Sequence, residues 1–535
     1  MWQTNWRERT SAMLSDRKWD IVIIGGGITG AGILLEAARN GMRALLVEQR
    51  DFAWGTSSRS SKLVHGGLRY LKEGKLLLTR DSVHEREQLL KDAAGLVEPQ
   101  GFAFADYRGR KPGRWMFSLG LALYDMMAGK RSRHYFRPDE FLLLAPHIAT
   151  DDLQGGLCYT DAKTDDARLV LRVLQEAIAA GGVAINYMAA RQLVRRDGRV
   201  CGVELQDGVT GQRQAVEAKA VISATGAWAD ALRQQAKSGA KLRPLRGSHL
   251  VLPAWRLPVA QAISLMHPQD GRPVFAFPWE GVTLVGTTDV DHREDMRNEA
   301  AITQQELAYL MAALDFQFPQ LRITRDDIIA TFAGVRPVID SGKTDPSKEG
   351  RDHAVWLEDG LLTVTGGKLT TFRLIARDAL NHAAPLLRGR HISRRSRPVF
   401  APAPPLPYDG KLTSFQRRRL VGRHGGFARL LVAAAQEGEL ETIPGTDTLY
   451  AELRWAARRE AVLHLEDLML RRTRLGLLLR EGGAELLPRV RAICQAELGW
   501  DDARWANEQA AYVALWRKHY SVPPAQGAQA PRRAA

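Results

Sequence analysis

Hydrophobic and polar positions alternate with two different periods along this chain. Between residues 18 and 395, short apolar runs of strand length alternate with longer segments that have helical spacing. This order is typical of an α/β fold with a parallel sheet. Residues 274–279 and 282–287 flank an E-G turn, and residues 191–205 form a hairpin-like pattern that ends in D-G. These patterns predict that a substrate domain contains a second, mixed and largely antiparallel sheet.

The C-terminal part has a different pattern. From about residue 409 to 520 the spacing is helical, most clearly in residues 449–479. A cluster of prolines separates it from the α/β part. The predicted order is an N-terminal extension (1–17), an α/β region with an interleaved substrate domain (18–395), a Pro-rich linker (396–408), a helical domain (409–520) and a disordered tail (521–535).

Residues 20–48 carry the pattern of a dinucleotide-binding βαβ unit. Residues 21–24 predict a buried strand, a helical segment follows, and residues 44–47 predict the second strand. Gly25, Gly27 and Gly30 fit the G-x-G-x-x-G spacing. These glycines allow a tight turn, approach of backbone N–H groups to a pyrophosphate, and close helix packing. Glu48 can accept hydrogen bonds from ribose hydroxyls, which disfavours NADP and leaves NAD and FAD open.

The next segment, residues 55–71, is rich in small hydroxyl side chains and has few large apolar ones. Such a segment cannot build a core, but it can wrap a cofactor, because hydroxyls donate hydrogen bonds and glycines permit close approach. The expected donors are Thr56, Ser57, Ser58, Ser60 and Ser61. The alternative is a solvated loop.

Within this segment the run T-S-S-R-S-S-K-L-V-H-G-G-L-R-Y-L resembles the FAD-dependent sn-glycerol-3-phosphate dehydrogenases, an aerobic, quinone-linked family. The resemblance continues in chain order through Y-T-D-A-K-T-D-D-A-R-L-V (159–170), I-S-A-T-G-A-W-A-D (222–230), G-S-H-L-V-L-P (247–253), G-T-T-D (286–289), G-V-R-P (334–337), G-G-K-L-T-T-F-R (366–373) and E-A-V-L-H-L-E-D-L-M-L-R-R-T-R (460–474). It implies a Rossmann-like three-layer FAD-binding domain, an interleaved mixed β-sheet substrate domain and a C-terminal helical domain.

The resemblance also implies the residues of the site. The expected FAD-binding residues are Gly25, Gly27, Gly30, Glu48, Thr56, Ser57, Ser58, Lys62, Leu63, His65, Thr225, Gly226, Gly367, Lys368, Leu369 and Thr370. The expected substrate-binding residues are Arg69, Tyr70, His249, Arg336 and Lys368. A substrate phosphate requires cationic donors, which Arg69, Arg336 and Lys368 supply. A base that titrates near neutral pH is most often His; His249 is the predicted base, and His65 is expected to orient the cofactor. The predicted catalytic set is therefore His249, Arg69, Arg336 and Lys368.

Charge points to an anionic partner surface. The net charge is +15 and the sequence pI is about 9.8. Residues 115–128 form an apolar segment, too short to span a membrane, between basic flanks. This segment predicts either an interfacial anchor or a buried amphipathic helix. As an anchor, it would insert Trp115, Phe117, Leu119 and Leu121.

Basic clusters in the C-terminal part permit a rival class of protein, one that binds nucleic acid or modifies RNA. The clusters at 417–423, 458–459 and 471–474 lie in Leu/Ala-rich helical sequence without an RNA-binding motif. A solvated basic helix face is therefore the favoured interpretation, and no nucleic-acid partner is expected.

The predicted activity is oxidation of sn-glycerol 3-phosphate to dihydroxyacetone phosphate by hydride transfer to FAD, with electrons passed to a membrane quinone. The alternatives are a glycerol-3-phosphate oxidase that uses oxygen and a basic flavin-fold protein that binds nucleic acid. The expected location is cytoplasmic, peripherally associated with the inner face of the cell membrane; a homodimer is left open. The three cysteines have no C-x-x-C spacing, which predicts neither a disulfide framework nor a metal site.

Overall fold

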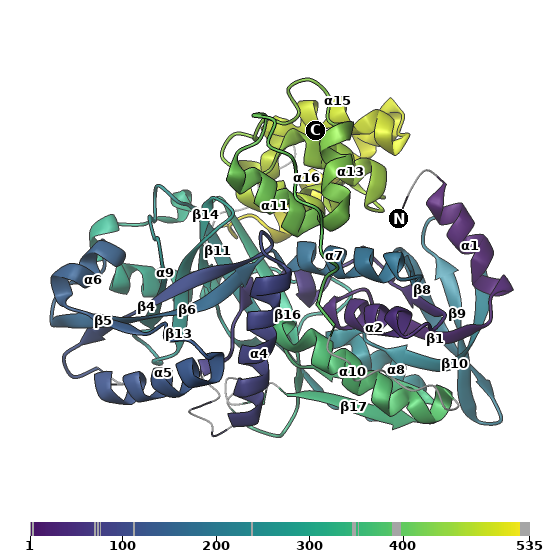
Figure 1. The fold of residues 1–535 in the computed structure, drawn as a ribbon, viewed down its shortest axis with the longest axis horizontal. Helices are drawn as coiled ribbons and strands as arrows, with labels where there is room; N and C mark the ends of the chain where they lie inside the picture. Colours follow the sequence, from purple (N-terminus) through teal and green to yellow (C-terminus); the bar gives the residue numbers. More distant parts are fainter. Residues whose placement is uncertain are drawn as a thin grey trace.

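The chain folds around two sheets and a set of C-terminal helices (Figure 1). The computed structural model describes residues 2, 5–68, 71, 74, 76–110, 113–236, 239–344, 349–350, 352–387 and 397–524. The chain visits the two sheets in turn, which confirms the interleaved arrangement: β1 and β2 belong to the first sheet, β3–β6 to the second, β7–β10 to the first, β11–β16 to the second, and β17–β18 to the first.

The first sheet has a parallel core in the order β18-β10-β1-β2-β7, with β17 antiparallel at the edge. Its strands are β1 (Trp19–Ile24), β2 (Ala44–Val47), β7 (Val183–Ile185), β10 (Arg213–Ser223), β17 (His353–Glu358) and β18 (Leu361–Gly366). β8 (Met188–Arg196) and β9 (Arg199–Asp207) extend β10 as an antiparallel meander. The hairpin expected in the substrate domain at residues 191–205 therefore lies in the first sheet. The prediction of its location was wrong, because the pattern of a hairpin does not specify which sheet it joins.

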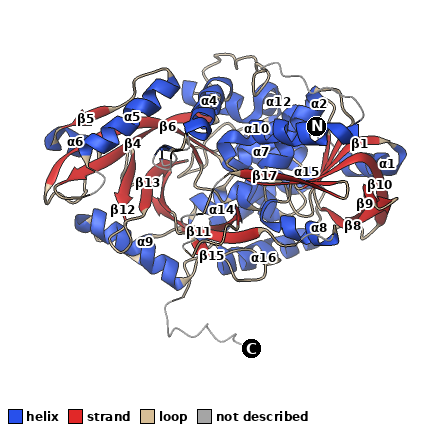
Figure 2. Ribbon diagram, turned by 90° about the horizontal axis from the view of Figure 1, so that it is seen from below, coloured by secondary structure: helices blue, strands red, loops and turns tan. Residues whose placement is uncertain are grey.

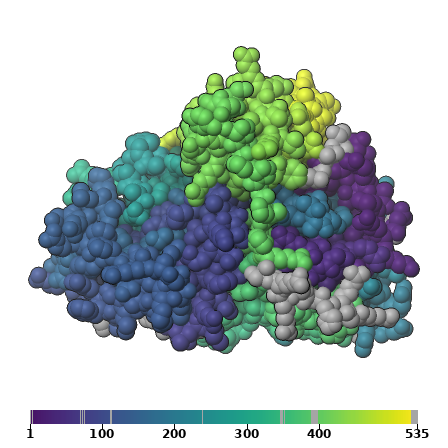
Figure 3. Space-filling view, viewed as in Figure 1, coloured from purple at the N-terminus to yellow at the C-terminus, as the bar shows by residue number. Residues whose placement is uncertain are grey.

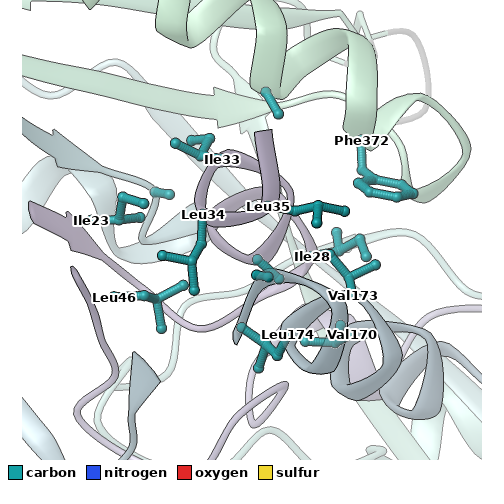
Figure 4. Packing of buried hydrophobic residues seen from close by; sticks show 14 of the residues in the cluster. Ile23, Ile28, Ile33, Leu34, Leu35, Leu46, Val170, Val173, Leu174 and Phe372 are labelled. Atoms are coloured by element: carbon teal, nitrogen blue, oxygen red, sulfur yellow. The ribbon is translucent and has the colours of Figure 1, made fainter. Parts of the chain in front are cut away.

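Both faces of the parallel strands are buried, which makes this region three layers deep. Ile21 and Ile23 face α2 (Ile28–Arg39), which lies between α7 (Asp166–Ala179) and α10 (Phe372–Ala383). Val22 and Ile24 face the opposite way, toward the β8–β9 meander. Figure 4 shows the helical side, where Leu46, Val173, Leu174 and Phe372 lie around α2 and its Leu34. Continuous apolar strands are expected where helices or strands cover both faces of a parallel sheet.

The second sheet is largely antiparallel, as predicted, with order β15-β11-β14-β13-β12-β4-β6-β3. Figure 2 labels its strands β4, β6, β11, β12 and β13. Its strands are β3 (Leu63–Val64), β4 (Val97–Tyr107), β5 (His134–Phe136), β6 (Leu153–Thr164), β11 (Leu242–Pro253), β12 (Ala262–Met266), β13 (Pro273–Trp279), β14 (Val282–Gly286), β15 (Val290–Asp291) and β16 (Ala330–Ile339). β16 pairs with β11, β5 pairs with β6, and the β12–β4 pair is parallel. Helices α4 (Leu76–Asp92), α5 (Arg114–Ala128), α6 (Pro138–Leu144) and α9 (Gln304–Gln317) pack around it.

The C-terminal helices form a lobe above the two sheets, and the linker runs down the surface from it (Figure 3). They are α11 (Ser414–His424), α12 (Ala428–Ala434), α13 (Tyr450–Arg459), the π-helical turn η9 (Asp467–Arg472), α14 (Leu475–Leu478), α15 (Leu487–Leu498) and α16 (Asp502–His519). α1 (Trp6–Asp16) packs beside β7 and β10, and α8 (Ala229–Gln235) beside β8 and β18. The predicted tail lies outside the described residues from 525 onward.

Several arginines of the C-terminal lobe are buried in ion pairs with the α/β region. Arg472 contacts Asp51 at 2.6 Å, and Arg474 contacts Asp165 at 2.9 Å. In a third pair the arginine belongs to the α/β region and the acid to the lobe: Arg168 of α7 contacts Glu460 at 2.6 Å. The solvated basic face expected at 417–423 and 471–474 is therefore wrong for the buried members, Arg419, Arg423, Arg471, Arg472 and Arg474. Some of their acidic partners, namely Asp51, Asp165 and Asp166, lie hundreds of residues away in the sequence, so no local pattern identifies these pairs.

Candidate functional site

The glycines of the turn after β1 are needed for two different reasons. A Cβ on Gly30 would lie 1.9 Å from the carbonyl oxygen of Gly25, and a Cβ on Gly25 would lie 2.5 Å from that of Ala224. Gly25 also has φ +115°, a conformation that other residues rarely adopt. Gly27 differs, because among the described residues its Cβ would meet only the Ser57 side chain, with Oγ at 3.1 Å, and its φ is −80°. The protein's own packing thus requires Gly25 and Gly30, whereas the space at Gly27 fits the approach of a dinucleotide phosphate.

Glu48 lies beside this turn at the carboxyl end of β2. Its carboxylate accepts hydrogen bonds from Gly26 N at 2.7 Å and Arg50 N at 2.8 Å. Burial raises the pKa of Glu48, and the two N–H donors oppose that rise. The next parallel strand, β10, ends beside the same turn, since a Cβ on Gly25 would lie 3.2 Å from Thr225 Cα. Ligands of open α/β sheets bind at the carboxyl ends of the strands, so this edge is the expected dinucleotide site.

Gly226 and Gly367 complete this edge. Gly226 has φ +56°, and its carbonyl oxygen accepts a hydrogen bond from Thr365 Oγ1 of β18 at 3.0 Å. Gly366 and Gly367 follow at the end of β18, with φ of +78° and +77°, before the short turn η6 (Leu369–Thr371) that leads into α10. The predicted cofactor residues of β1, β2, β10 and β18 are thereby brought to one edge of the first sheet.

Residues 55–62, which we call the hydroxyl loop, connect the two sheets. Ser57 Oγ accepts a hydrogen bond from Ile28 N at 3.0 Å, at the start of α2. Thr56 Oγ1 donates to the carbonyl of Val335 in the second sheet, and Ser61 Oγ lies 2.9 Å from His249 Nε2. Ser58 is buried. The alternative of a solvated loop is therefore wrong.

Lys62 holds this loop from inside. Its Nζ donates to Ser58 O at 2.8 Å and to both carboxylate oxygens of Asp166 at 3.0 Å. Burial lowers the pKa of Lys62 to about 8, against the attraction of Asp166. The side chain of this predicted cofactor residue is thus engaged within the protein, and Leu63 follows it half-buried in β3.

His249 and Arg336 lie on one face of the second sheet. β11 and β16 pair so that His249 lies opposite Phe332, Gly247 opposite Gly334, and Leu245 opposite Arg336. Positions two apart on a strand share a face, so Gly247 and Gly334 separate the two functional side chains. A Cβ on Gly247 would lie 2.3 Å from Arg336 Nη2, and one on Gly334 would lie 2.5 Å from the carbonyl oxygen of Arg59. The paired glycines therefore make room for Arg336 and for the hydroxyl loop.

The His249 imidazole is buried and stacked on Phe332, with ring centroids 4.6 Å apart. Burial, together with the charges of Arg336 and Lys62, lowers the pKa of His249 well below its usual range. Nδ1 has no hydrogen-bond partner among the described residues. An imidazole that is neutral at pH 7 and has a free ring nitrogen can accept a proton from a bound hydroxyl.

The Arg336 guanidinium is held by side chains of the G-T-T-D motif. It donates to Asp289 Oδ1 at 2.8 Å and to Thr287 Oγ1 at 3.1 Å, and its side chain remains 23% exposed. Asp289 belongs to the G-T-T-D motif but was not a predicted site residue. Its pairing with Arg336 indicates that it orients this guanidinium. A guanidinium that is oriented by a carboxylate and is still partly exposed is suited to bind a phosphate.

The segment after β18 meets the end of the hydroxyl-rich segment. Thr370 Oγ1 donates to the carbonyl of His65 at 3.2 Å, and Lys368 Nζ donates to Ser82 Oγ of α4 at 3.0 Å. Burial lowers the pKa of His65 to about 4, opposed by Asp161 and assisted by Lys368. His65, Lys368, Leu369 and Thr370 thus lie together, whereas Arg69 and Tyr70 lie outside the described residues.

Two acids that hold the site, Asp166 and Asp161, were not among the predicted site residues. Asp166 accepts from Ser60 Oγ at 2.7 Å as well as from Lys62. Asp161 accepts from Tyr124 Oη at 2.8 Å, from Arg86 at 2.6 Å and also from Gly66 N. Both acids belong to the quoted run 159–170, so the motif was visible, but a motif does not identify the partners of its residues.

These features, namely a dinucleotide turn with space at Gly27, an acid at the end of β2 and two sheets joined by the hydroxyl loop, define an FAD-dependent oxidoreductase. Comparison with known proteins agrees: residues 20–379 match the FAD dependent oxidoreductase family, and residues 386–505 match the C-terminal domain of alpha-glycerophosphate oxidase. The chain belongs to the FAD-dependent oxidoreductases and, within them, to the aerobic glycerol-3-phosphate dehydrogenase family. It is 39% identical over 390 residues to the aerobic glycerol-3-phosphate dehydrogenase of Bacillus subtilis, covering 72% of this chain and 69% of that one. It is 38% identical over 382 residues to a Staphylococcus aureus enzyme of the same name, covering 70% and 68%.

Solved structures give the same result. The chain is similar to the glycerol-3-phosphate dehydrogenase from Bacillus halodurans complexed with FAD, with a TM-score of 0.77, 27% identity and coverage of 97% and 98%. L-alpha-glycerophosphate oxidase from Mycoplasma pneumoniae shares the fold, with a TM-score of 0.57 and 18% identity over 72% of this chain and 99% of that one. The predicted family, fold class, enzyme class and FAD cofactor are confirmed.

Proposed function

We propose that this enzyme oxidises sn-glycerol 3-phosphate to dihydroxyacetone phosphate and passes the electrons to a membrane quinone. One observation carries the substrate assignment. A partly exposed guanidinium, Arg336, and a buried neutral imidazole, His249, share one face of the second sheet beside the hydroxyl loop. The cation suits the phosphate, which distinguishes this substrate from a plain alcohol, and the imidazole suits the hydroxyl proton that oxidation must remove.

Residues of the protein bind the cofactor and the substrate phosphate and accept the hydroxyl proton. Bound FAD supplies the hydride acceptor. Arg336, oriented by Asp289, holds the substrate phosphate, and we assign Lys368 to the same ligand or to negative charge on the cofactor. His249 Nδ1 receives the hydroxyl proton, while Nε2 stays engaged with Ser61. The Gly25–Gly27–Gly30 turn, Glu48, Thr225, Gly226 and the hydroxyl loop hold the dinucleotide.

We place the enzyme at the inner face of the cell membrane, attached through α5. Trp115, Met116 and Leu119 of this helix are 81%, 71% and 73% exposed, and Leu77 at the start of α4 is 74% exposed. Phe117 and Leu121, which the sequence pattern assigned to the inserted face, point inward: Phe117 stacks on Phe104, and Leu121 is buried. In the described part of the chain no helix is long and apolar enough to cross a membrane. An apolar helix face on a cationic protein favours an anionic lipid surface.

An oxygen-using oxidase is the second candidate, and one observation keeps it open. Residues 386–505 match a domain of alpha-glycerophosphate oxidase, so the C-terminal lobe does not distinguish the two electron acceptors. The nucleic-acid alternative loses its support, because many of the C-terminal arginines are buried in ion pairs.

The decisive experiment is anaerobic mixing of the FAD-loaded protein with sn-glycerol 3-phosphate. Loss of the visible flavin absorbance is expected, and unphosphorylated glycerol serves as the matched control. Absence of bleaching by glycerol 3-phosphate would overturn the substrate assignment. Reoxidation of the bleached protein by a quinone analogue in vesicles, faster than by dissolved oxygen, supports the dehydrogenase; the reverse order supports the oxidase.

A further inference from the structure

The hydroxyl loop contacts the C-terminal lobe as well as the start of α2. Arg474, in the C-terminal lobe, donates from Nη2 to the carbonyl oxygen of Ser58 at 3.2 Å and also to Asp166. Its Nε donates to Asp165 Oδ1 at 2.9 Å, and its Nη1 donates to Leu470 O at 2.8 Å. Four acceptors thus fix this buried guanidinium, and one of them is the backbone of the loop.

The partner shared by Arg474 and the loop is Asp166, at the start of α7. Its carboxylate accepts from Ser60 N at 3.0 Å, Ser60 Oγ at 2.7 Å and Lys62 Nζ at 3.0 Å. Lys62 Nζ and Arg474 Nη2 also share the Ser58 carbonyl as an acceptor. Removal of Arg474 would therefore take one donor from the Ser58 carbonyl and, among the described residues, leave Lys62 as the cation paired with the buried Asp166 carboxylate.

A second contact comes from the end of the lobe. Tyr520, directly after α16, accepts at its hydroxyl from Arg59 Nη2 at 3.1 Å and donates to Glu299, which also pairs with Arg59. The Tyr520 carbonyl accepts from Thr331 N of β16 at 2.7 Å, so the backbone of this segment is anchored to the second sheet. Arg59 in turn donates to Trp54 O, just before the loop.

The loop residues that face the site, Ser57 and Ser61, lie on either side of the two contacts at Ser58 and Arg59. Ser61 contacts His249 Nε2, and Ser57 contacts Ile28 N at the start of the dinucleotide helix. A loop of hydroxyl residues has little apolar burial to hold it in one conformation, so its geometry depends on polar contacts.

We propose that the C-terminal lobe is a positioning element of the flavin site, acting through Arg474 and Tyr520 on the hydroxyl loop. Arg474 and Tyr520 are positioning residues: they hold Ser57–Ser61 in the conformation that retains FAD and aligns His249. The inference rests on the proposed function only for the role of His249; its effect on FAD retention is independent of the substrate.

The test compares FAD binding with folding in three variants and one control. Arg474→Met removes the clamp, Arg474→Lys keeps the charge but not the fork, and Tyr520→Phe removes a single hydroxyl. Arg419→Met is the control, because Arg419 is equally buried in the lobe but pairs with Glu452 at 2.7 Å and Glu280 at 2.8 Å, away from the loop. Each apoprotein is titrated with FAD, and its thermal midpoint is measured without FAD.

We expect Arg474→Met to raise the FAD dissociation constant about tenfold or more, since a lost charged hydrogen bond is worth about that factor. Arg474→Lys and Tyr520→Phe should raise it about threefold. Arg419→Met should lower the thermal midpoint while leaving FAD affinity within about twofold of wild type. Equal loss of FAD affinity in Arg419→Met and Arg474→Met, or unchanged affinity in both Arg474→Lys and Tyr520→Phe, would overturn the inference. If Arg474→Met does not fold, the latter two variants decide.

A second readout tests alignment. In the reconstituted variants, the rate of flavin bleaching by glycerol 3-phosphate is measured at saturating FAD across pH. We expect a lower rate and a shifted pH profile in Tyr520→Phe and Arg474→Lys, and a wild-type profile in Arg419→Met. Failure of the wild-type protein to bleach would refute the proposed substrate and leave the FAD titration as an independent test of the lobe's role.

Discussion

Substitution of Gly27 by Ala tests whether the space beside this residue belongs to the cofactor. A Cβ here would meet Ser57 Oγ at 3.1 Å and no other side chain or backbone atom closer than 3.9 Å among the described residues. The backbone has φ −80°, which alanine adopts without strain. Gly30→Ala is the matched variant, because its Cβ would lie 1.9 Å from the Gly25 carbonyl oxygen.

The two variants should separate folding from cofactor binding. For apo Gly27→Ala, loss of a glycine N-cap costs a few tenths to about 1 kcal/mol, and the reduced entropy of the unfolded chain offsets part of this. Gly30→Ala forces backbone movement and should cost about 1–3 kcal/mol or more in the free energy of unfolding. For FAD, loss of one charge-assisted contact to the pyrophosphate costs about 1.5–3 kcal/mol, which corresponds to about 10- to 150-fold weaker binding.

The assay is unfolding of the apoproteins in urea together with titration of FAD into each. We expect apo Gly27→Ala to unfold close to the wild-type midpoint and to bind FAD poorly, whereas Gly30→Ala loses stability first. Wild-type FAD affinity in Gly27→Ala would refute the assignment of this space to the pyrophosphate. A loss of stability as large as that of Gly30→Ala would show that Gly27 is needed for packing instead.

Three further predictions concern the phosphate, the buried acids and the membrane. Arg336→Ala should weaken binding of glycerol 3-phosphate by about 2–5 kcal/mol but that of glycerol far less, as measured by anaerobic titration; equal losses would remove Arg336 from the phosphate site. Asp51→Ala should cost about 3–5 kcal/mol in urea unfolding near neutral pH, because it leaves buried arginines unpaired. Burial opposes ionisation of Asp51, but its arginine partners lower the pKa from 3.8 to about 2. The wild-type advantage should therefore hold above pH 4 and shrink by about 2 kcal/mol as the pH falls through about 2; an advantage that is independent of pH would contradict this. Trp115→Ser with Leu119→Ser should make salt alone release the protein from anionic vesicles while activity with a soluble dye is retained, whereas exposed Leu430→Ser should not; an unchanged need for detergent would exclude α5 as the anchor.

Much of the flavin site was predictable because its elements are local in sequence. The glycine spacing, the apolar runs of β1 and β2 and the acid at Glu48 lie within thirty residues, and steric limits on a βαβ turn leave few alternatives. The E-G turn between β13 and β14 was predictable for the same reason. The pairing of His249 with Ser61, or of Arg336 with Asp289, required the fold, since Ser61 lies in the hydroxyl loop and Asp289 follows β14. The fold also decided that His249 and Arg336 share one face, through the register of β11 with β16.

The sequence by itself determined the dinucleotide turn and the apolar segment at 115–128, because period and spacing are local properties, and the class of protein followed from the resemblance of its motifs to a known family. The tertiary structure decided which side of that segment is exposed, which sheet the 188–207 hairpin joins, and that Arg471, Arg472 and Arg474 are buried. The physical reason is the same in each case. A basic run has the same composition whether its charges contact water or a distant carboxylate. Only packing brings Asp51, Asp165 and Asp166 to those arginines.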